Sequence, residues 1–323
     1  MRILTADDVR VALSMRKAID AVRAGFIALS TGRAHVPLRS VLDTPGGVLL
    51  TMPAQITGAP VNTVKVVSVC PDNPTRGLPT IHAAVLVSDA QTGVPLALMD
   101  GRYLTALRTG AASGLATELL ARPDASVLAV IGAGAQARTQ VAAVCAVRPI
   151  TEIRIYSLSG AEQLADELRS QYGAHITAVA SASAALRGAD VVVAATNSKT
   201  PVVTLADLTP GVHINGIGSF APDMQEIAAD VVAAARVIVD HRASAWAEAG
   251  DLIIPRDQGI ITEDHIYAEI GEIAAELKPG RQDPQEITFF KSVGNAVQDA
   301  VVAQRVLEVA SARGLGIEVA LSP

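Results

Sequence analysis

The chain has 323 residues, half of them hydrophobic and 18% charged, with a formal net charge of −6. This composition excludes intrinsic disorder, and without a basic run it predicts no nucleic-acid partner. Two cysteines without paired spacing and six histidines without ligand spacing argue against a disulfide scaffold and a metal site, and no apolar run is long enough to cross a membrane. We therefore expect a cytoplasmic, metal-free protein without membrane contact.

The first hundred residues predict a helical start followed by a sheet. Thr5 with Asp8 three residues later is typical of a helix capping box, and apolar residues between Met15 and Leu29 then recur at helical spacing. Short β-branched runs punctuated by prolines follow, which predicts a mixed or antiparallel sheet. The runs cover residues 48–52, 61–69 and 83–88, and the alanine-rich segment 100–121 predicts a connecting helix.

After Pro123 the pattern alternates between apolar strands and amphipathic helices. Such alternation predicts βαβ units and a Rossmann-type, doubly wound parallel sheet, so the fold class is α/β with a second, mixed α+β part. The predicted strands are 127–131, 153–156, 191–195, 212–217, 237–239 and 287–292, the helices between them include 136–146 and 161–171, and a valine-lined helix follows residue 296.

A glycine motif lies at the first turn of this alternating region. It has the form G-x-G-x-x-A, directly after an apolar strand and at the start of a helix. In such a motif Gly132 permits the tight turn, Gly134 lets the backbone approach a pyrophosphate, and Ala137 lets helix and strand pack closely. Together with Ala135 and Gln136 at the helix N-terminus, the loop predicts a dinucleotide site.

The end of the second strand predicts which nucleotide binds. A carboxylate there would hold the ribose 2′-hydroxyl of NAD, but residues 155–160 contain none. Ser157 and Ser159 can donate hydrogen bonds to a 2′-phosphate, although no arginine lies between them. We therefore predict NADP as the cofactor, with NAD also possible.

Several segments together resemble the ornithine cyclodeaminase/mu-crystallin family, in order and over nearly the whole chain. They are residues 65–68, 77–80, 104–113, 131–137, 195–198, 213–218 and 290–294, with Gln298 and Asp299. The resemblance implies a homodimer, with a substrate and dimerisation domain from residues 1–115 and 296–323 and an NAD(P)-binding Rossmann domain from residues 116–295. Family members include ornithine cyclodeaminases, an alanine dehydrogenase and reductases of cyclic ketimines, all acting on α-amino or α-imino acids.

The resemblance also implies catalytic residues. Arg39, Lys65 and Arg108 match positions that bind the substrate carboxylate, and Thr80 matches a further contact. The chemistry agrees, because the arginine fork binds a carboxylate in two places and lysine adds a point charge. Clustered cations also lower the pKa of a lysine, so Lys65 is a candidate for proton relay.

Four further positions are expected at the cofactor. Thr109 matches a residue that faces the nucleotide phosphates in relatives, and Thr196 follows a parallel strand, where the carboxyl ends of strands meet a cofactor. Ile217 and Ser292 match family positions near the nicotinamide.

Two departures from the cyclodeaminases decide the predicted reaction. Where those enzymes carry an aspartate that engages the amino groups of ornithine, this chain has Phe220, which can neither ionise nor accept a proton. Leu50 lies closest to the position at which those enzymes carry the acid that receives the distal ammonium of ornithine. Burying an ammonium without a counter-charge costs several kcal/mol. The sequence therefore predicts a reductase of small cyclic imino acids such as Δ1-pyrroline-2-carboxylate or Δ1-piperideine-2-carboxylate.

Three alternatives stay open. One is ornithine cyclodeaminase, with Asp223 or Glu226 taking the place of the missing aspartate. Another is an alanine-dehydrogenase-like enzyme, which needs the same grip on a carboxylate. The third is a non-catalytic, NADP-dependent binding protein, which would tolerate the loss of Lys65 far better than an enzyme.

Overall fold

The computed structural model describes residues 1–321 and divides the chain into two compact units. Unit 1 comprises residues 1–108 together with the segment that begins at Asn295, and unit 2 comprises Thr109–Gly294. One helix, α3 (Gly101–Leu120), contributes to both units. The sequence analysis placed the divisions at 115/116 and 295/296, and the roles assigned to the two parts stay predictions.

Unit 1 is a mixed sheet with helices on one face. Its capping box is present as predicted, because Asp8 N donates to Thr5 Oγ1 at 3.3 Å and Thr5 N donates to Asp8 Oδ2 at 2.9 Å. The elements are β1 (Arg2–Leu4), α1 (Ala6–Ala12), α2 (Met15–Ser30), β2 (Ala34–His35), β3 (Ser40–Thr44), β4 (Gly47–Ile56), β5 (Val61–Val69), a 3₁₀ turn (Asn73–Arg76), β6 (Ile81–Asp89), β7 (Pro95–Asp100), the start of α3, α11 (Ala296–Arg313) and β16 (Ile317–Glu318).

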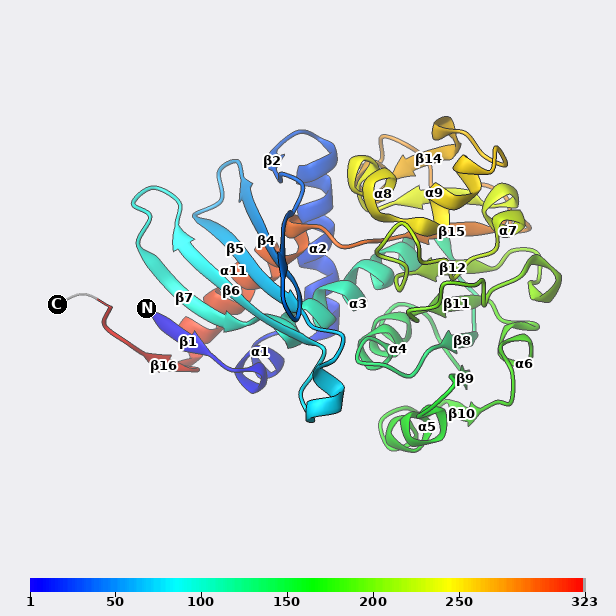
Figure 1. Ribbon diagram of the computed structural model, residues 1–323, viewed down its shortest axis with the longest axis horizontal. Coiled ribbons are helices and arrows are strands. Elements are labelled where there is room, and N and C mark those ends of the chain that lie inside the picture. Colours follow the sequence, from blue (N-terminus) through cyan, green and yellow to red (C-terminus); the bar gives the residue numbers. More distant parts are fainter. Residues whose placement is uncertain (322–323) are drawn as a thin grey trace. The chain divides into compact units, whose positions relative to one another are not determined.

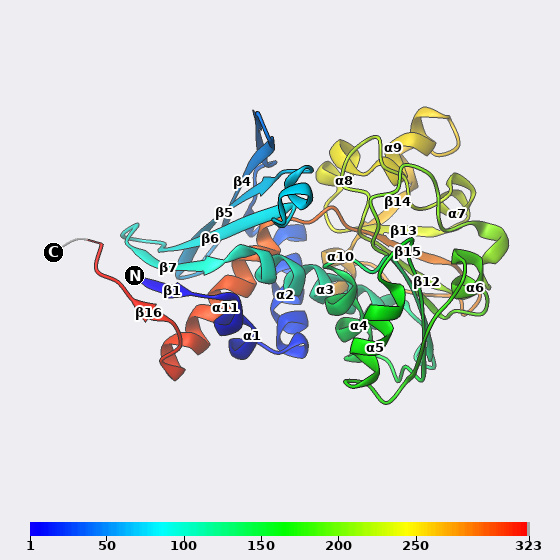
Figure 2. The same cartoon turned by 60° about the horizontal axis from the view of Figure 1, so that its bottom comes forward.

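The sheet of unit 1 has the strand order β16-β1-β7-β6-β5-β4-β2, with β3 paired to β4. All pairs are antiparallel except β1 with β7. Helix α11 packs against β4, β5 and β6 and against α2, and Figure 2 shows α1, α2 and α11 on one side of the strands. Alternate residues of each strand therefore face the helices or the opposite side.

Unit 2 is a parallel sheet of eight strands in the order β10-β9-β8-β11-β12-β15-β13-β14, which confirms the predicted α/β fold class (Figure 1). Its elements are the rest of α3, β8 (Val127–Ile131), α4 (Ala137–Cys145), β9 (Glu152–Tyr156), α5 (Ala161–Arg169), β10 (His175–Ala178), α6 (Ala182–Leu186), β11 (Val191–Ala194), β12 (His213–Gly216), α7 (Ala229–Ala234), β13 (Arg236–Val239), α8 (Arg242–Glu248), α9 (Gly250–Asp257), β14 (Ile266–Glu269), α10 (Ile270–Ala274) and β15 (Thr288–Lys291), with 3₁₀ turns at Leu205–Asp207 and Glu263–His265.

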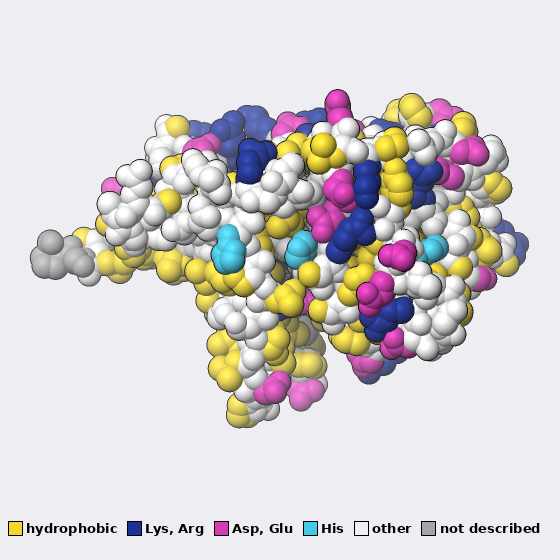
Figure 3. Space-filling model, turned by 90° about the horizontal axis from the view of Figure 1, so that it is seen from above, with side chains coloured by type: hydrophobic (Ala, Val, Ile, Leu, Met, Phe, Trp, Pro, Cys, Tyr) yellow, Lys and Arg dark blue, Asp and Glu magenta, His cyan; other side chains and the backbone are white. Residues whose placement is uncertain are grey.

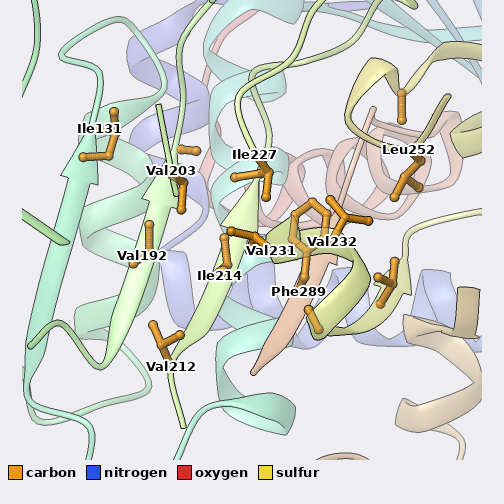
Figure 4. Packing of buried hydrophobic residues seen from close by; sticks show 14 of the residues in the cluster. Ile131, Val192, Val203, Val212, Ile214, Ile227, Val231, Val232, Leu252 and Phe289 are labelled. Atoms are coloured by element: carbon orange, nitrogen blue, oxygen red, sulfur yellow. The ribbon is translucent and has the colours of Figure 1, made fainter. Parts of the chain in front are cut away.

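Both faces of this parallel sheet are buried. Along β8, Leu128 and Val130 join one apolar cluster with α4 and α5, whereas Ala129 and Ile131 join another with α6, α7 and α9. Figure 4 shows part of the second cluster, in which Val192 of β11, Ile214 of β12 and Phe289 of β15 belong to one apolar layer with Ile227. The alanine- and valine-rich strands of the sequence are thus explained, because each residue of these strands packs against a helix or loop layer.

The order in which the chain adds strands to this sheet reverses between β8 and β11, although all the strands are parallel. From β8 the chain proceeds outward through β9 and β10 and then returns to β11 on the other side of β8. Ligands of open α/β sheets bind outside the carboxyl ends of the strands at such a reversal. The fold of unit 2 therefore places the candidate nucleotide site at the ends of β8 and β11.

No helix within residues 1–321 combines the length and the apolar character that a membrane span needs. Both Cys70 and Cys145 are free thiols. Among the described side chains, no group of three or more His, Cys, Asp and Glu residues could hold a metal ion.

Candidate functional site

Lys65 is buried in the middle of a strand of unit 1. It faces the helices, and the register of β5 places it between Met52 of β4 and Val85 of β6. Only 2% of its side chain is exposed. A lysine in an apolar row of a sheet needs a partner for its charge, because an unpaired buried ammonium is costly.

The partner is Asp299, in the first turn of α11. Its Oδ2 lies 2.7 Å from Lys65 Nζ, and its Oδ1 lies 3.1 Å from Arg108 Nε. Arg108 also donates to Gln298 Oε1, and Gln298 in turn accepts from the backbone N–H of Asn295, the residue that caps the helix. The start of α11 thus supplies a carboxylate and an amide to two cations from different elements, at the helix end where a negative charge is favourable.

The role of Asp299 was missed in the sequence analysis, although two signals pointed to it. Gln298 and Asp299 belong to the segments that carry the family resemblance, and they follow the last predicted strand at the start of a helix. Lys65 and Arg108 both lie within apolar segments, so each of them required a counter-charge. Nothing in the local pattern identified which acid would supply it.

Burial and neighbouring charges lower the pKa of Lys65 to about 8. Desolvation is the largest cause, the charges of Arg108 and Arg39 act in the same direction, and Asp299 opposes them. The sequence analysis predicted the direction from the cations alone, but burial contributes more. Lys65 and Arg108 carry two positive charges against the single negative charge of Asp299, so the cluster favours binding of a further anion.

The other two predicted residues of unit 1 differ in how closely they approach this cluster. Arg39 is half-buried just before β3, and the β3–β4 register, with Ser40 opposite Thr51, continues to place it beside Met52. Thr80 is half-buried at the end of the loop before β6. It precedes Val85, the partner of Lys65, by about 16 Å of extended strand. The strand register therefore brings Arg39 to the row of Lys65 but does not bring Thr80 there.

The glycine loop of unit 2 has the geometry of a phosphate cradle. Gly132 adopts φ +109°, and a Cβ on it would lie 2.5 Å from the carbonyl oxygen of Ala195. A Cβ on Gly134 would meet nothing within 4 Å, so the space above the loop is open, and Ala137 begins α4. The side-chain oxygen Oε1 of Gln136 is buried without a hydrogen-bond partner. An open cradle at a helix N-terminus fits the pyrophosphate of a dinucleotide.

The loop after β9 contains the residues expected at the adenosine ribose. Ser157 is half-buried, Leu158 and Ser159 are exposed, and Gly160 adopts φ +74° as the N-cap of α5. A Cβ on Gly160 would lie 3.9 Å from the Cβ of Ala133, which places this loop beside the glycine loop. The first arginine after the glycines, Arg138, is paired with Glu167, whose Oε1 lies 2.8 Å from its Nε.

Three of the four remaining predicted cofactor residues, Thr196, Ile217 and Ser292, follow strands of unit 2, and two of these three use their hydroxyl groups within the protein. Thr196 Oγ1 donates to Glu226 Oε1 at 2.8 Å, and Ser292 Oγ donates to Asp240 Oδ2 at 2.8 Å. Ile217 is buried directly after β12, and Thr109 is buried in α3. Their contacts with a nucleotide stay predictions.

The acids considered for the cyclodeaminase alternative are both engaged elsewhere. Asp223 is exposed and forms an ion pair with Lys199 at 2.6 Å. Glu226 is fully buried and accepts hydrogen bonds from Thr196, Gly218 and Ser219. Phe220 follows β12 with 43% of its surface exposed. Neither carboxylate is available to replace the missing aspartate without breaking these interactions.

Comparisons with known proteins agree with this architecture over the full length. Residues 1–314 match the ornithine cyclodeaminase/mu-crystallin family. The chain is 39% identical to a Delta(1)-pyrroline-2-carboxylate reductase of Bacillus cereus over 321 residues, which cover 98% of each chain. Among solved structures it resembles Thermococcus litoralis Delta(1)-pyrroline-2-carboxylate reductase in complex with NADH and L-proline, with 41% identity, a TM-score of 0.96 and coverage of 99% of this chain and 100% of that one. An archaeal alanine dehydrogenase dimer with bound NAD follows with 35% identity, a TM-score of 0.94 and coverage of 100% and 99%.

Removing the charge of Asp299 tests the buried cluster of unit 1. The Asp299→Asn variant leaves Lys65 and Arg108 without their counter-charge, so we expect it to lose about 3–5 kcal/mol of the free energy of unfolding in urea titrations. The double variant Lys65→Met, Asp299→Asn removes one charge of each sign and is expected to recover part of that loss.

The matched control is Glu308→Gln on the same helix. Glu308 pairs with Arg305 at the surface, so this change is expected to cost under about 1 kcal/mol. A loss in Asp299→Asn no larger than that of the control would contradict the role assigned to Asp299.

Proposed function

The chain belongs to the ornithine cyclodeaminase/mu-crystallin family, and from this membership we propose that it is an NAD(P)H-dependent reductase of cyclic imino acids. Its substrates are ketimines of the Δ1-pyrroline-2-carboxylate and Δ1-piperideine-2-carboxylate type. The observation that carries the proposal is the full-length likeness to two Delta(1)-pyrroline-2-carboxylate reductases, one of them solved with NADH and L-proline. The buried cation cluster of unit 1 supports it, because such substrates carry a carboxylate.

The residues of unit 1 bind and orient the substrate in this proposal. Arg108 and Lys65, fixed by Asp299, bind the substrate carboxylate together with Arg39. A bound nicotinamide supplies the hydride for the carbon of the C=N bond. With a pKa of about 8, Lys65 is mostly protonated at neutral pH and can donate a proton toward the imine nitrogen directly or through water. Thr80 is kept as a further contact on the strength of the family resemblance alone.

Residues of both units, each considered by itself, favour an imino acid over ornithine. Leu50 of β4 packs against the apolar cluster that contains Met52 and Val67, so this position offers no charge to a distal ammonium. Phe220 offers none either, and Asp223 and Glu226 are engaged in other interactions. An alanine-dehydrogenase-like reaction needs the same carboxylate grip and is favoured as the second candidate by the likeness to the archaeal alanine dehydrogenase.

For the cofactor we propose a preference for NADPH with NADH also accepted. The relatives solved with a nucleotide contain NADH or NAD, so use of a nicotinamide dinucleotide is common among them. The loop after β9 carries Ser157 and Ser159 and no carboxylate that would repel a 2′-phosphate. The cofactor residues proposed from the sequence are retained: Thr109, Gly132, Gly134, Ala135, Gln136, Ser157, Ser159, Thr196, Ile217 and Ser292.

Nicotinamide oxidation with candidate substrates tests the reaction. We expect NADPH and NADH to be oxidised in the presence of Δ1-pyrroline-2-carboxylate or Δ1-piperideine-2-carboxylate, with the larger kcat/KM for NADPH. Conversion of ornithine to proline and reduction of pyruvate with ammonia are measured in parallel and are expected to be slower. Ornithine turnover without imine reduction would reverse the assignment. Binding of NADPH and of the imino acids without any turnover would favour the binding-protein alternative.

Substitution of Lys65 separates catalysis from simple binding. The Lys65→Ala variant removes a charged hydrogen-bond donor, so we expect kcat/KM for the imine to fall by about a hundredfold. Wild-type kcat/KM should also fall as the pH rises through about 8, because the protonated form of Lys65 is lost there. In Lys65→Arg this decline should move to higher pH, since arginine stays charged.

The control for this series is Lys17→Ala, since Lys17 is exposed on α2. It should leave both the rate and its pH dependence unchanged. Retention of most activity in Lys65→Ala would remove Lys65 from the mechanism.

We further propose that the protein is a homodimer, with the uncovered face of the unit 1 sheet at the interface. Opposite to the row that contains Lys65, five strands contribute an apolar row made of Pro53, Val64, Leu86, Leu98 and Ile3, each paired with the next across the sheet. Leu86 and Ile3 are 38% and 37% exposed. On the side of the molecule shown in Figure 3, which is not the uncovered face of this sheet, hydrophobic side chains reach the surface in small groups between polar and charged ones. A contiguous apolar row on an uncovered face is consistent with an oligomer interface, and the archaeal alanine dehydrogenase is a dimer.

Light scattering after gel filtration tests this assembly. The chain has a mass of 33.3 kDa, so a homodimer should appear at twice that mass. Leu86→Lys introduces a charge into the apolar row and is expected to shift the mass toward the monomer. Val94→Lys, in the exposed turn before β7, is the control and should leave the dimer intact. A monomeric wild type would contradict the proposal.

A further inference from the structure

The carboxylate of Glu226 is buried in unit 2 and surrounded by donors. Oε1 accepts from Thr196 N at 2.5 Å and from Thr196 Oγ1 at 2.8 Å, and Oε2 accepts from Gly218 N at 2.7 Å and from Ser219 N at 3.0 Å. The residue has no exposed surface. One side chain thus accepts hydrogen bonds from backbone N–H groups of two different loops. Removing it would leave buried donors without partners, which costs free energy of folding.

The two loops lie at the carboxyl ends of neighbouring strands. Thr196 follows β11, and Gly218 and Ser219 follow β12, so Glu226 joins the ends of two strands beside the reversal of the sheet. The packing is close, because a Cβ on Gly218 would lie 2.0 Å from the carbonyl oxygen of Thr196 and 2.5 Å from Glu226 Oε1. Gly132 of the phosphate cradle packs against the same β11 loop at Ala195.

A second set of interactions fixes the backbone of Glu226. Its N–H donates to Asp251 Oδ1 at 2.7 Å, and its carbonyl accepts from Val203 N at 3.0 Å. Asp251 lies in the first turn of α9 and pairs through Oδ2 with Lys291 Nζ at 2.7 Å, at the end of β15. The neighbouring Ile227 packs into the apolar layer shown in Figure 4. The side chain therefore projects from a segment that is anchored on both sides.

The surroundings of Glu226 include groups that raise its pKa and groups that lower it. Backbone N–H groups can only donate, so the three that face its oxygens favour the ionised carboxylate. Burial raises the pKa of Glu226, and the charge of Asp251 raises it further, while Lys291 and the hydrogen bonds from Thr196 lower it. Protonation would place an O–H against donors and weaken the junction of the two loops.

We propose that Glu226 is a positioning residue for the nicotinamide nucleotide: by joining the loops after β11 and β12 it fixes the edge of unit 2 against which the nucleotide binds. The inference rests on the proposed function only for the identity of that ligand. Thr196 and Ile217, both predicted to face the cofactor, are the residues whose placement depends on this junction. Glu226 itself is enclosed by protein and acts through them.

The test compares Glu226→Gln with wild type by calorimetric titration with NAD⁺ and NADP⁺, which withstand mild acid. The amide keeps the size of the side chain but turns an NH₂ group toward backbone donors. We expect both nucleotides to bind at least tenfold more weakly at pH 8. The matched control is Asp223→Asn, an exposed acid of the same loop paired with Lys199, which should bind as wild type does.

The pH dependence separates positioning from general stabilisation. In wild type the affinity for NAD⁺ should fall as the pH is lowered from 8 toward the raised pKa of Glu226, because protonation weakens the acceptor, with Asp251 and Lys291 as the ionisable groups whose charges act on it. In Glu226→Gln the affinity for NAD⁺ should be low and should not show this fall; NAD⁺ is the probe here because the 2′-phosphate of NADP⁺ itself titrates at about pH 6. A variant that binds as wild type does, or that binds weakly but keeps the wild-type pH dependence, would overturn the proposal.

Two further outcomes are decisive. If Glu226→Gln does not fold, Glu226→Asp takes its place: a carboxylate that is one carbon shorter does not reach both loops, so nucleotide binding as tight as that of wild type overturns the proposal. A wild type that binds nucleotide with the expected pH dependence but reduces no imine contradicts the proposed reaction and leaves the role of Glu226 supported. A wild type that binds neither nucleotide overturns both.

Discussion

The contact between Asp299 and two buried cations is the interaction on which the site of unit 1 depends. Lys65 comes from the middle of a strand, Arg108 from α3 and Asp299 from the first turn of α11, so the carboxylate joins three elements that are distant in sequence. Each cation would be too costly to bury alone. Because one negative charge faces two positive ones, the cluster stays attractive to an anion after its own pairing is complete. In the proposed function a substrate carboxylate completes this balance, which would explain why a charge-rich cluster persists in an apolar core.

Local patterns in the sequence were sufficient for most of the fold. The capping box at Thr5, the strand before Gly132 and the valine-rich strand that begins at Val191 depend on residues that are neighbours in the chain, and all three are present. The parallel sheet followed from the alternation of such segments, because few topologies satisfy it. The sequence analysis did not resolve short elements such as β10, α6 and β14, whose four or five residues are too few to show a period.

The candidate site could be predicted residue by residue but not contact by contact. The apolar residues around Lys65 in the sequence indicated that this lysine is unusual. Its partner Asp299 is far away in the sequence, and no sequence motif or residue spacing connects the two. Thr196 and Ser292 were expected near the cofactor from their positions, but the sequence did not indicate that their hydroxyl groups donate to Glu226 and Asp240. Pairing between distant side chains is decided by tertiary packing, which a local pattern does not encode.

Buried carboxylates organise both units, but with opposite charge balances. In unit 1 the cations outnumber Asp299, and the excess positive charge of their side chains is what can bind a carboxylate. In unit 2 Glu226 and Asp251 outnumber Lys291, so a free carboxylate there would repel the phosphates of a nucleotide. Hydrogen bonds from backbone N–H groups to Glu226 weaken that repulsion, and the proposed phosphate site is formed by the N–H groups at the start of α4. Each unit can therefore attract an anion by a different means, side-chain cations for the substrate and backbone dipoles for the nucleotide.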